Sequence, residues 1–175
     1  MFDIRFMSEV DPKARLDGGD VLFTGKHVFC GLSERTNSEG VEVLRKAFPS
    51  HIEVIAIPVE ENLHLKCAMT VVGSDTLVAA STPASKAMTV KALKMAQGDR
   101  AAPGYRVHRV QSEEAANVVR VNDTLLVPKG LDRETYATYA QLDPTIAHIV
   151  QLENDQFTKI DGALTCRSLL RWDFE

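Results

Sequence analysis

The sequence predicts an α/β fold in which one supersecondary unit occurs three times. Three observations carry this prediction: pairs of apolar strands flank short turns, a helical stretch follows each pair, and a further apolar strand follows each helix. The turns centre near positions 25, 74 and 122, so the units repeat at steps of about 49 and 48 residues. A repeat of this length is typical of units arranged in an array or a ring.

The strand pairs have the pattern of β-hairpins, because their apolar runs are joined by turns that contain Gly, Asn or Asp. These residues favour tight turns. The predicted strands span 21–24 and 27–30 in the first pair, 69–72 and 76–80 in the second, and 117–121 and 124–127 in the third.

The three helical stretches have recognisable ends. The first begins at the polar residues 36–38 and stops at Pro49. The second begins at Pro83, because proline at the first helical position needs no amide donor, and the third begins at Asp132 and stops at Pro144. Strands follow at 52–57, 105–110 and 146–152, which gives units of approximately 16–60, 61–112 and 113–155.

The two ends of the chain are predicted to be single strands. Phe2, Ile4 and Phe6 alternate with other residues at the N-terminus, and residues 161–172 form a strand-like segment within a closing strand at 160–173. A strand without a neighbour leaves backbone groups unpaired. We therefore expect a single domain over 1–175 that forms an incomplete ring, or whose ends close on a second copy or a partner chain.

Composition excludes several classes of protein. Hydrophobic residues make up 45% and charged residues 25% of the chain, as in soluble globular proteins, and the net charge is −4 without a basic cluster. This argues against a nucleic-acid partner. No apolar run approaches the roughly 20 residues that span a bilayer, and the first residues lack the pattern of a signal peptide. Three widely spaced cysteines do not suggest a disulfide framework, so we expect free thiols and a cytoplasmic protein.

Three residues are candidates for catalysis: Asp17 within Leu-Asp-Gly-Gly-Asp, His64, and Cys166. Taken singly, each has an ordinary explanation, namely a turn aspartate, a core histidine and a buried thiol. The repeat changes this interpretation, because Asp17 and His64 occupy the same point of successive units. The same point of the third unit falls near Ser112 and Glu113, and Cys166 comes before the last strand.

Equivalent points of units in a ring lie on one rim, so these three side chains are predicted to face one cavity. A cysteine, a histidine and a carboxylate are the minimum set for nucleophilic catalysis by a thiolate. Cys30 and Cys67 fall inside predicted strands and are expected to be packing residues.

Four stretches resemble segments of the dimethylarginine dimethylaminohydrolase family, within the guanidine-modifying enzymes. They are the acid-bearing stretch 16–25, the arginine-bearing stretch 31–37, the histidine-bearing stretch 63–66 and the nucleophile stretch 161–166. The similarity extends from about Phe2 to the C-terminus. It implies a five-bladed α/β propeller of ββαβ units, of which this chain holds three. The acidic residues by which the family grips the substrate guanidinium from the preceding region have no counterpart in 1–15.

The resemblance also implies an activity, the hydrolysis of methylated arginine, a small-molecule substrate, to citrulline. Cys166 would attack the guanidinium carbon, and His64 would protonate the leaving amine and then activate water. Asp17 would orient His64 or bind the guanidinium, Arg35 would pair with the substrate carboxylate, and the Ile160 carbonyl would contact its amino group. No cofactor is implied, although zinc inhibits the family by binding the thiolate, here Cys166.

Two alternatives stay open from the sequence. One is arginine deimination or amidino transfer, which uses the same cysteine, histidine and acid on the same scaffold. The other is a truncated, non-catalytic chain that acts, if at all, by binding a partner, and its support is the missing part of the propeller.

Overall fold

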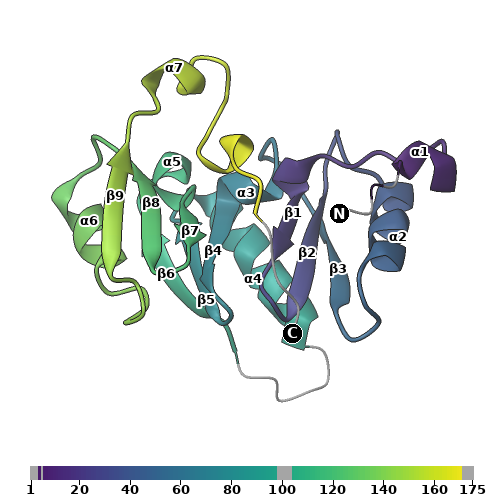
Figure 1. Cartoon of the computed structure of the whole chain (residues 1–175), viewed down its shortest axis with the longest axis horizontal. Coiled ribbons are helices and arrows are strands. Elements are labelled where there is room, and N and C mark those ends of the chain that lie inside the picture. The colour runs from purple at the N-terminus through teal and green to yellow at the C-terminus, as the bar shows by residue number, and fades with distance from the viewer. Residues whose placement is uncertain (1–3, 5, 98–103, 171–175) are drawn as a thin grey trace.

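A computed structural model of the chain describes residues 4, 6–97 and 104–170. It contains three three-stranded sheets, which lie side by side (Figure 1). The first consists of β1 (Val21–Phe23), β2 (His27–Leu32) and β3 (Glu53–Pro58). The second consists of β4 (Met69–Gly73), β5 (Thr76–Ala80) and β6 (Arg106–Val110), and the third of β7 (Val119–Val121), β8 (Thr124–Pro128) and β9 (His148–Leu152).

Each sheet is one ββαβ unit, as predicted. The first two strands form an antiparallel hairpin, and the third strand is parallel to the second, after a helix that connects them. The connecting helices are α2 (Ser38–Ala47), α4 (Pro83–Gln97) and α6 (Arg133–Tyr139). Parallel neighbours need such a crossover, because a short turn cannot bring the chain back to the starting end of the sheet.

Local sequence explains where these elements begin and turn. Gly25 and Asn122, in the first and third hairpin turns, have φ angles of 86° and 55°, a left-handed conformation that Gly and Asn tolerate best. The Asn37 side chain accepts a hydrogen bond from the Gly40 amide at the start of α2, and Asp132 caps α6 through the Thr135 amide. Asn37 and Asp132, polar residues at the predicted helix starts, are therefore N-caps.

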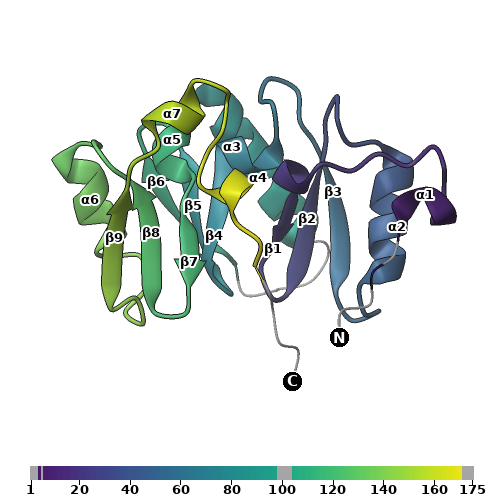
Figure 2. The same cartoon turned by 45° about the horizontal axis from the view of Figure 1, so that its top comes forward.

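The units share their hydrophobic cores with their neighbours. One core joins Phe29 and Ile57 of the first unit to Leu77 and Met88 of the second, so α4 packs against β3. Another joins strands of the second unit to Leu125 and neighbouring residues of the third. Since each interface is continuous core, the three sheets form an arc with a fixed curvature (Figure 2).

One rim of this arc carries four short helical turns. They are η1 (Gly18–Asp20), α3 (Leu65–Ala68), α5 (Glu113–Ala116) and η2 (Thr165–Arg167). The first three precede the first strand of a unit, and η2 lies beside them on the same edge of the sheets (Figure 2). This rim is where the sequence places its candidate residues.

The structure corrects the two ends. Ile4 and Phe6 lie in no strand, and a helical turn, α1 (Met7–Val10), follows them, while Phe2 is outside the described residues. Residues 160–170 also form no strand: Asp161 has a φ of 57°, and the Gly162 amide donates to the Phe157 carbonyl at 2.8 Å, which reverses the chain after α7 (Asp155–Thr158). Residues 171–173 lie outside the described part. In both places the apolar alternation has no neighbouring strand to pair with.

Among the described residues, no helix is long and apolar enough to cross a membrane.

Candidate active site

Asp17 and His64 lie in contact at the starts of two adjacent turns. Asp17 precedes η1, and its Oδ1 accepts a hydrogen bond from the Gly19 amide at 3.0 Å. Its Oδ2 lies 3.3 Å from Nε2 of His64, the residue that precedes α3. The buried Nε2 has no hydrogen-bond partner among the described residues, so the contact is not aligned as a hydrogen bond, and it is an ion pair only when the imidazole is protonated.

Gly19 makes this contact sterically feasible. A Cβ atom at position 19 would lie 2.7 Å from Cγ and 2.9 Å from Nδ1 of the His64 ring. Carbon atoms do not approach so closely, so the imidazole occupies the space that a side chain at 19 would fill. The glycine of the Asp-Gly-Gly-Asp motif therefore sets where His64 lies.

The surroundings of Asp17 favour its ionised form. The Gly19 amide lowers the pKa of the Asp17 carboxyl most, and the neighbouring His64 and Arg35 act in the same direction, while partial burial opposes them. Asp17 is therefore a carboxylate at neutral pH, and it faces an imidazole that it can orient.

Asp20 fixes the backbone of this half of the site. The side chain is fully buried, and its Oδ2 accepts hydrogen bonds from Ser33 Oγ at 2.6 Å and Thr36 Oγ1 at 2.7 Å. Its Oδ1 accepts from the Leu65 amide at 3.0 Å, directly after His64. One carboxylate thus joins the acid-bearing, arginine-bearing and histidine-bearing segments.

Cys166 lies in η2, and the residue is exposed. Its turn is attached to the body of the fold through Asn117, whose Oδ1 accepts from the Thr165 amide at 3.0 Å and whose Nδ2 donates to Thr165 Oγ1 at 3.1 Å. Leu164, only 3% exposed, is the apolar anchor of the same turn.

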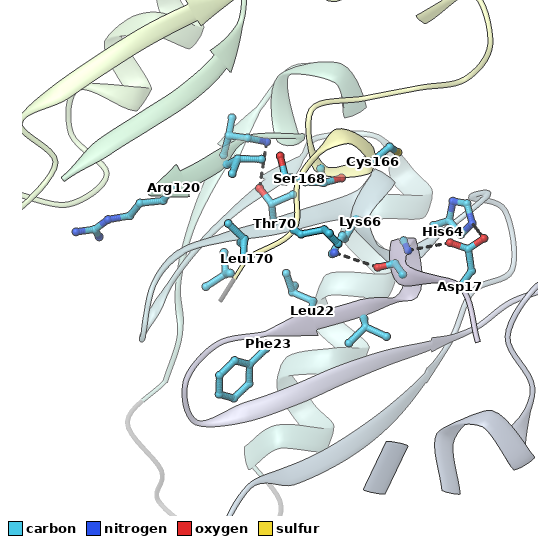
Figure 3. A pocket seen from close by; sticks show the side chains of 18 of the residues that line it. Asp17, Leu22, Phe23, His64, Lys66, Thr70, Arg120, Cys166, Ser168 and Leu170 are labelled. Carbon is cyan, nitrogen blue, oxygen red and sulfur yellow. Dashed lines mark hydrogen bonds and ion pairs between the residues drawn. The ribbon is translucent and has the colours of Figure 1, made fainter. Parts of the chain in front are cut away.

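Asp17, His64 and Cys166 line one cavity of about 660 Å³. Figure 3 shows Cys166 on one side of it, and the Asp17–His64 pair beside it. Lys66 lines the same cavity, and its ammonium group donates to the Gly18 carbonyl at 3.0 Å (Figure 3). Burial lowers the pKa of Lys66 most, and the neighbouring Cys166 and acidic groups oppose this shift. The remaining wall is largely apolar, with Leu22, Val71, Val119 and others from the first strands of the three units.

The other predicted residues are less central. Arg35 is exposed and does not line the cavity, but it lies near enough to Asp17 to lower its pKa. Ile160 is 76% exposed on the loop before η2 and does not line the cavity either, so its role stays a prediction. Cys30 is buried in β2, which raises the pKa of its thiol to about 12. Cys67 lies in α3 rather than in a strand, and burial raises the pKa of its thiol.

Within 4, 6–97 and 104–170, no group of three or more His, Cys, Asp or Glu side chains is arranged to hold a metal ion.

Sequence reasoning missed Asp20, Lys66 and Asn117 as parts of the site. Asp20 lies three residues after Asp17 and Lys66 two residues after His64, but their immediate sequence neighbours do not distinguish them from turn residues. Asn117 looks like the start of a strand, and its partner Thr165 is 48 residues away. A signal was present in the repeat, because Asp20 and Asn117 both end the turn that precedes a hairpin.

Comparisons with known proteins identify the family and support the fold. Residues 2–144 match the family model described as arginine deiminase. An uncharacterised protein of Aeropyrum pernix is 34% identical over 91% of this chain and 54% of its own length. The N(G),N(G)-dimethylarginine dimethylaminohydrolase of Streptomyces coelicolor is 31% identical over 88% of this chain and 54% of its own length.

A solved structure of the Pseudomonas aeruginosa enzyme of that name, a cysteine-to-serine mutant complexed with citrulline, superposes with a TM-score of 0.67. At 22% identity, over 89% of this chain and 56% of that one, it supports the fold. The chain spans about half the length of the relatives that it matches. It belongs to the arginine deiminase family, together with its dimethylarginine dimethylaminohydrolase relatives.

Proposed function

We propose that the protein hydrolyses Nω-methylated arginines to citrulline and methylamine or dimethylamine, with Cys166 as nucleophile. The observation that carries the proposal is that Cys166, His64 and Asp17 line one cavity. The likeness to a dimethylarginine dimethylaminohydrolase over 88% of the chain supports the choice of substrate.

The proposed reaction has two steps. In the first, the Cys166 thiolate attacks the central guanidinium carbon, and the C–N bond to the methylated nitrogen breaks as His64 gives that nitrogen a proton. This leaves a covalent thiouronium. In the second step, His64 takes a proton from water, the resulting hydroxide attacks the same carbon, and the C–S bond breaks. Citrulline leaves, and the thiolate is regenerated.

The remaining roles follow from position. Both carboxylate oxygens of Asp17 are engaged, one by the Gly19 amide and one by His64. This supports the role of orienting His64 over that of binding the guanidinium. Arg35, exposed near Asp17, is proposed to pair with the substrate carboxylate, because a guanidinium fork binds a carboxylate bidentately. The Ile160 carbonyl is proposed to contact the substrate amino group.

The test is to incubate the purified chain with asymmetric dimethylarginine and to measure citrulline and dimethylamine together. Equal amounts of both products are expected, and Cys166→Ser should abolish them. Cys67→Ser is the matched control, because it changes a thiol outside the cavity lining and should retain activity. A folded chain that forms neither product would contradict the proposal.

A second candidate reaction is arginine deimination, which the description of the matching family model favours. Unmethylated arginine supplied to the same assay would then give citrulline and ammonia at the higher rate. Amidino transfer would instead give ornithine when an amine acceptor such as glycine is present.

We also propose that the chain associates with a second copy of itself through β9. In the first unit, the third strand β3 is covered by α4 of the next unit, and Ile55 and Ile57 are buried. In β9 the residues Ile149 and Val150 are 37% and 40% exposed. Sedimentation velocity should show a mass that rises with concentration, and Val150→Lys should lower it. A monomer at all concentrations would contradict this association.

A further inference from the structure

Three residues hold the same place in successive units of the arc. Asp20 is the last residue of η1, Ala68 is the last residue of α3, and Asn117 directly follows α5. Each therefore lies where a rim turn passes into the first strand of its unit. All three side chains are buried, at 0%, 0% and 5% exposure.

Two of these residues bind the backbone of a neighbouring rim turn, and both bonds fall beside a candidate catalytic residue. Asp20 Oδ1 accepts from the amide of Leu65, the residue after His64, at 3.0 Å. Asn117 Oδ1 accepts from the amide of Thr165, the residue before Cys166, at 3.0 Å. The same kind of contact thus holds the histidine and the nucleophile.

The middle position provides an internal comparison. Ala68 has no polar side chain, and the next turn, α5, carries no candidate catalytic residue. That turn is held in other ways, by Thr70 Oγ1 donating to the Ala116 carbonyl at 2.6 Å and Tyr139 Oη donating to the Ala115 carbonyl at 2.5 Å. Asp20 and Asn117, whose side chains accept a hydrogen bond from the amide of the next turn, precede turns that carry a candidate catalytic residue. Ala68 precedes a turn that carries none.

We propose that Asp20 and Asn117 are a matched pair of positioning residues, which set His64 and Cys166 at fixed places beside one cavity. Neither touches the reacting atoms. Each acts through the backbone amide next to the residue that it places.

The choice of asparagine at 117 follows from the contacts it makes. Its Oδ1 accepts from the Thr165 amide, while its Nδ2 donates to the Lys66 carbonyl at 3.3 Å and to Thr165 Oγ1 at 3.1 Å. Only an amide side chain offers an acceptor and two donors at this length. Asn117 thereby joins the histidine-bearing turn to the cysteine-bearing turn.

Asn117 is also the main polar attachment of the nucleophile segment. Between described residues, no other hydrogen bond connects 154–170 to the rest of the fold; the remaining bonds of the segment are internal to it. Loss of this side chain should therefore allow the Cys166 turn to shift. A displacement of about 1 Å at a reacting centre lowers a rate by about 10²-fold.

The test uses a matched pair of thiol reagents, 2-chloroacetamidine, which is cationic, and 2-chloroacetamide, which is neutral. Both alkylate a thiolate by displacing chloride, and labelling at Cys166 is followed by peptide mass spectrometry. The amidine should react faster in the unmodified protein, because Asp17 attracts its charge toward a correctly placed thiol. The ratio of the two rate constants therefore reports the position of Cys166 relative to Asp17 and His64.

Asn117→Leu should lower this ratio by about tenfold or more, with a smaller change in the rate of the neutral reagent. Tyr139→Phe is the matched control, because it removes a buried hydrogen bond of the turn that carries no reactive group, and it should keep the ratio. An unchanged ratio in Asn117→Leu, or no preference for the amidine in the unmodified protein, would overturn the proposal.

If Asn117→Leu does not fold, Asn117→Ser replaces it, because a serine hydroxyl is too short to reach Thr165, and the same outcomes apply. Asn117→Asp keeps the acceptor for the Thr165 amide and should recover part of the ratio that Asn117→Ser loses. Asp20→Asn, which retains a carbonyl oxygen for the Leu65 amide, should lower the ratio less than Asn117→Leu does.

The inference concerns the site of the proposed function but does not depend on turnover. A protein that prefers the amidine and loses this preference in Asn117→Leu supports the positioning role even if it forms no citrulline. If the protein is active, Asn117→Leu should lower kcat by about 10²-fold and change KM less, since it displaces the thiol and leaves Arg35, the proposed partner of the substrate carboxylate, in place. A change confined to KM would overturn the role.

Discussion

The two sides of the cavity differ in how much structure holds them. The acid–histidine side is built into the first two units, where the buried Asp20 carboxylate receives three hydrogen bonds and Gly19 packs against the His64 ring. The nucleophile side is a short turn on a segment outside every sheet, and Cys166 is exposed. Among the described residues, its hydrogen bonds to the body of the fold all involve the Asn117 side chain, and the buried Leu164 adds apolar packing.

This difference separates two tasks of a nucleophilic site. The acid and the histidine must keep one mutual geometry throughout the reaction, and a core that cannot relax provides this. The nucleophile must form a bond with a substrate atom and then be released from it. A turn that lies outside the core and has few attachments can place a side chain for this task. Loss of the buried Asp20 carboxylate on the first side should therefore affect folding, while substitutions on the second side should affect the reaction more than stability.

The largest effect is expected from Asp20→Leu. The substitution leaves three donors without an acceptor, the buried Thr36 hydroxyl and Leu65 amide and the half-buried Ser33 hydroxyl. Each unsatisfied donor costs about 1–3 kcal/mol, so the free energy of unfolding should fall by roughly 3 kcal/mol or more. Urea unfolding followed by circular dichroism measures this. A loss below about 1 kcal/mol would show that the acid–histidine side does not depend on this carboxylate.

Gly19→Ala should affect the reaction more than the fold. The new methyl group would overlap the His64 ring, which must turn away from Asp17 to make room. Citrulline formation should fall by about 10²-fold, because the histidine no longer meets the reacting atoms in line. Gly18→Ala is the matched control, since a Cβ there meets nothing within 4 Å, and it should keep most of the activity. Equal activity of Gly19→Ala and Gly18→Ala would show that the space left by Gly19 does not set the position of His64.

The sequence predicted the three units well, because each depends on local signals. Turn residues such as Gly25 and Asn122 and helix caps such as Asn37 act within a few residues of the chain. It failed at the ends, where Ile4 and Phe6 have the alternation of a strand but no strand beside them to complete a ladder. Hydrophobic alternation predicts which face of a strand would be buried. It does not predict whether a neighbouring strand is present to pair with it.

The candidate site was predicted in part for the same reason. Equivalent points of the repeat placed Asp17 and His64 on one rim, and the structure puts them 3.3 Å apart. The placement of Cys166 depends on a contact between Asn117 and Thr165, which are 48 residues apart in the sequence. No local pattern encodes such a contact, since asparagine before a strand is usually a turn residue.

A smaller effect is expected in the pH dependence of stability. The folded protein holds the Asp17 pKa below its ordinary value of 3.8, mainly through the Gly19 amide. Its stabilisation is therefore complete above that value and is lost as the pH falls through the lowered folded pKa. Asp17→Asn should be less stable than the unmodified protein at about pH 6, and the difference should shrink at about pH 3. A difference that grows on acidification would contradict the sign. Asp132→Asn, far from the cavity, should behave alike, because Thr135 also lowers the Asp132 pKa.

The smallest effect should come from Arg167→Ala, which loosens the nucleophile segment from within. The Arg167 guanidinium lies 4.2 Å above the Phe157 ring centre, and its Nη2 donates to Asn154 Oδ1 at 3.1 Å. Exposed cation–π contacts contribute about 0.5–1 kcal/mol, so the free energy of unfolding should change by less than about 1 kcal/mol. Arg106→Ala is the matched control, because Arg106 is also an exposed arginine whose guanidinium is held by neighbouring side chains, those of Asp75 and Thr76.

The two arginine variants should therefore match in urea unfolding and differ in chemistry. Only Arg167→Ala should change the ratio of amidine to amide labelling at Cys166, by about two- to fivefold, because the loop that carries the thiol loses one of its internal braces while Asn117 still holds Thr165. If Arg167→Ala lowered this ratio as far as Asn117→Leu does, the nucleophile would be placed by its own loop, and the rim contact from Asn117 would be secondary.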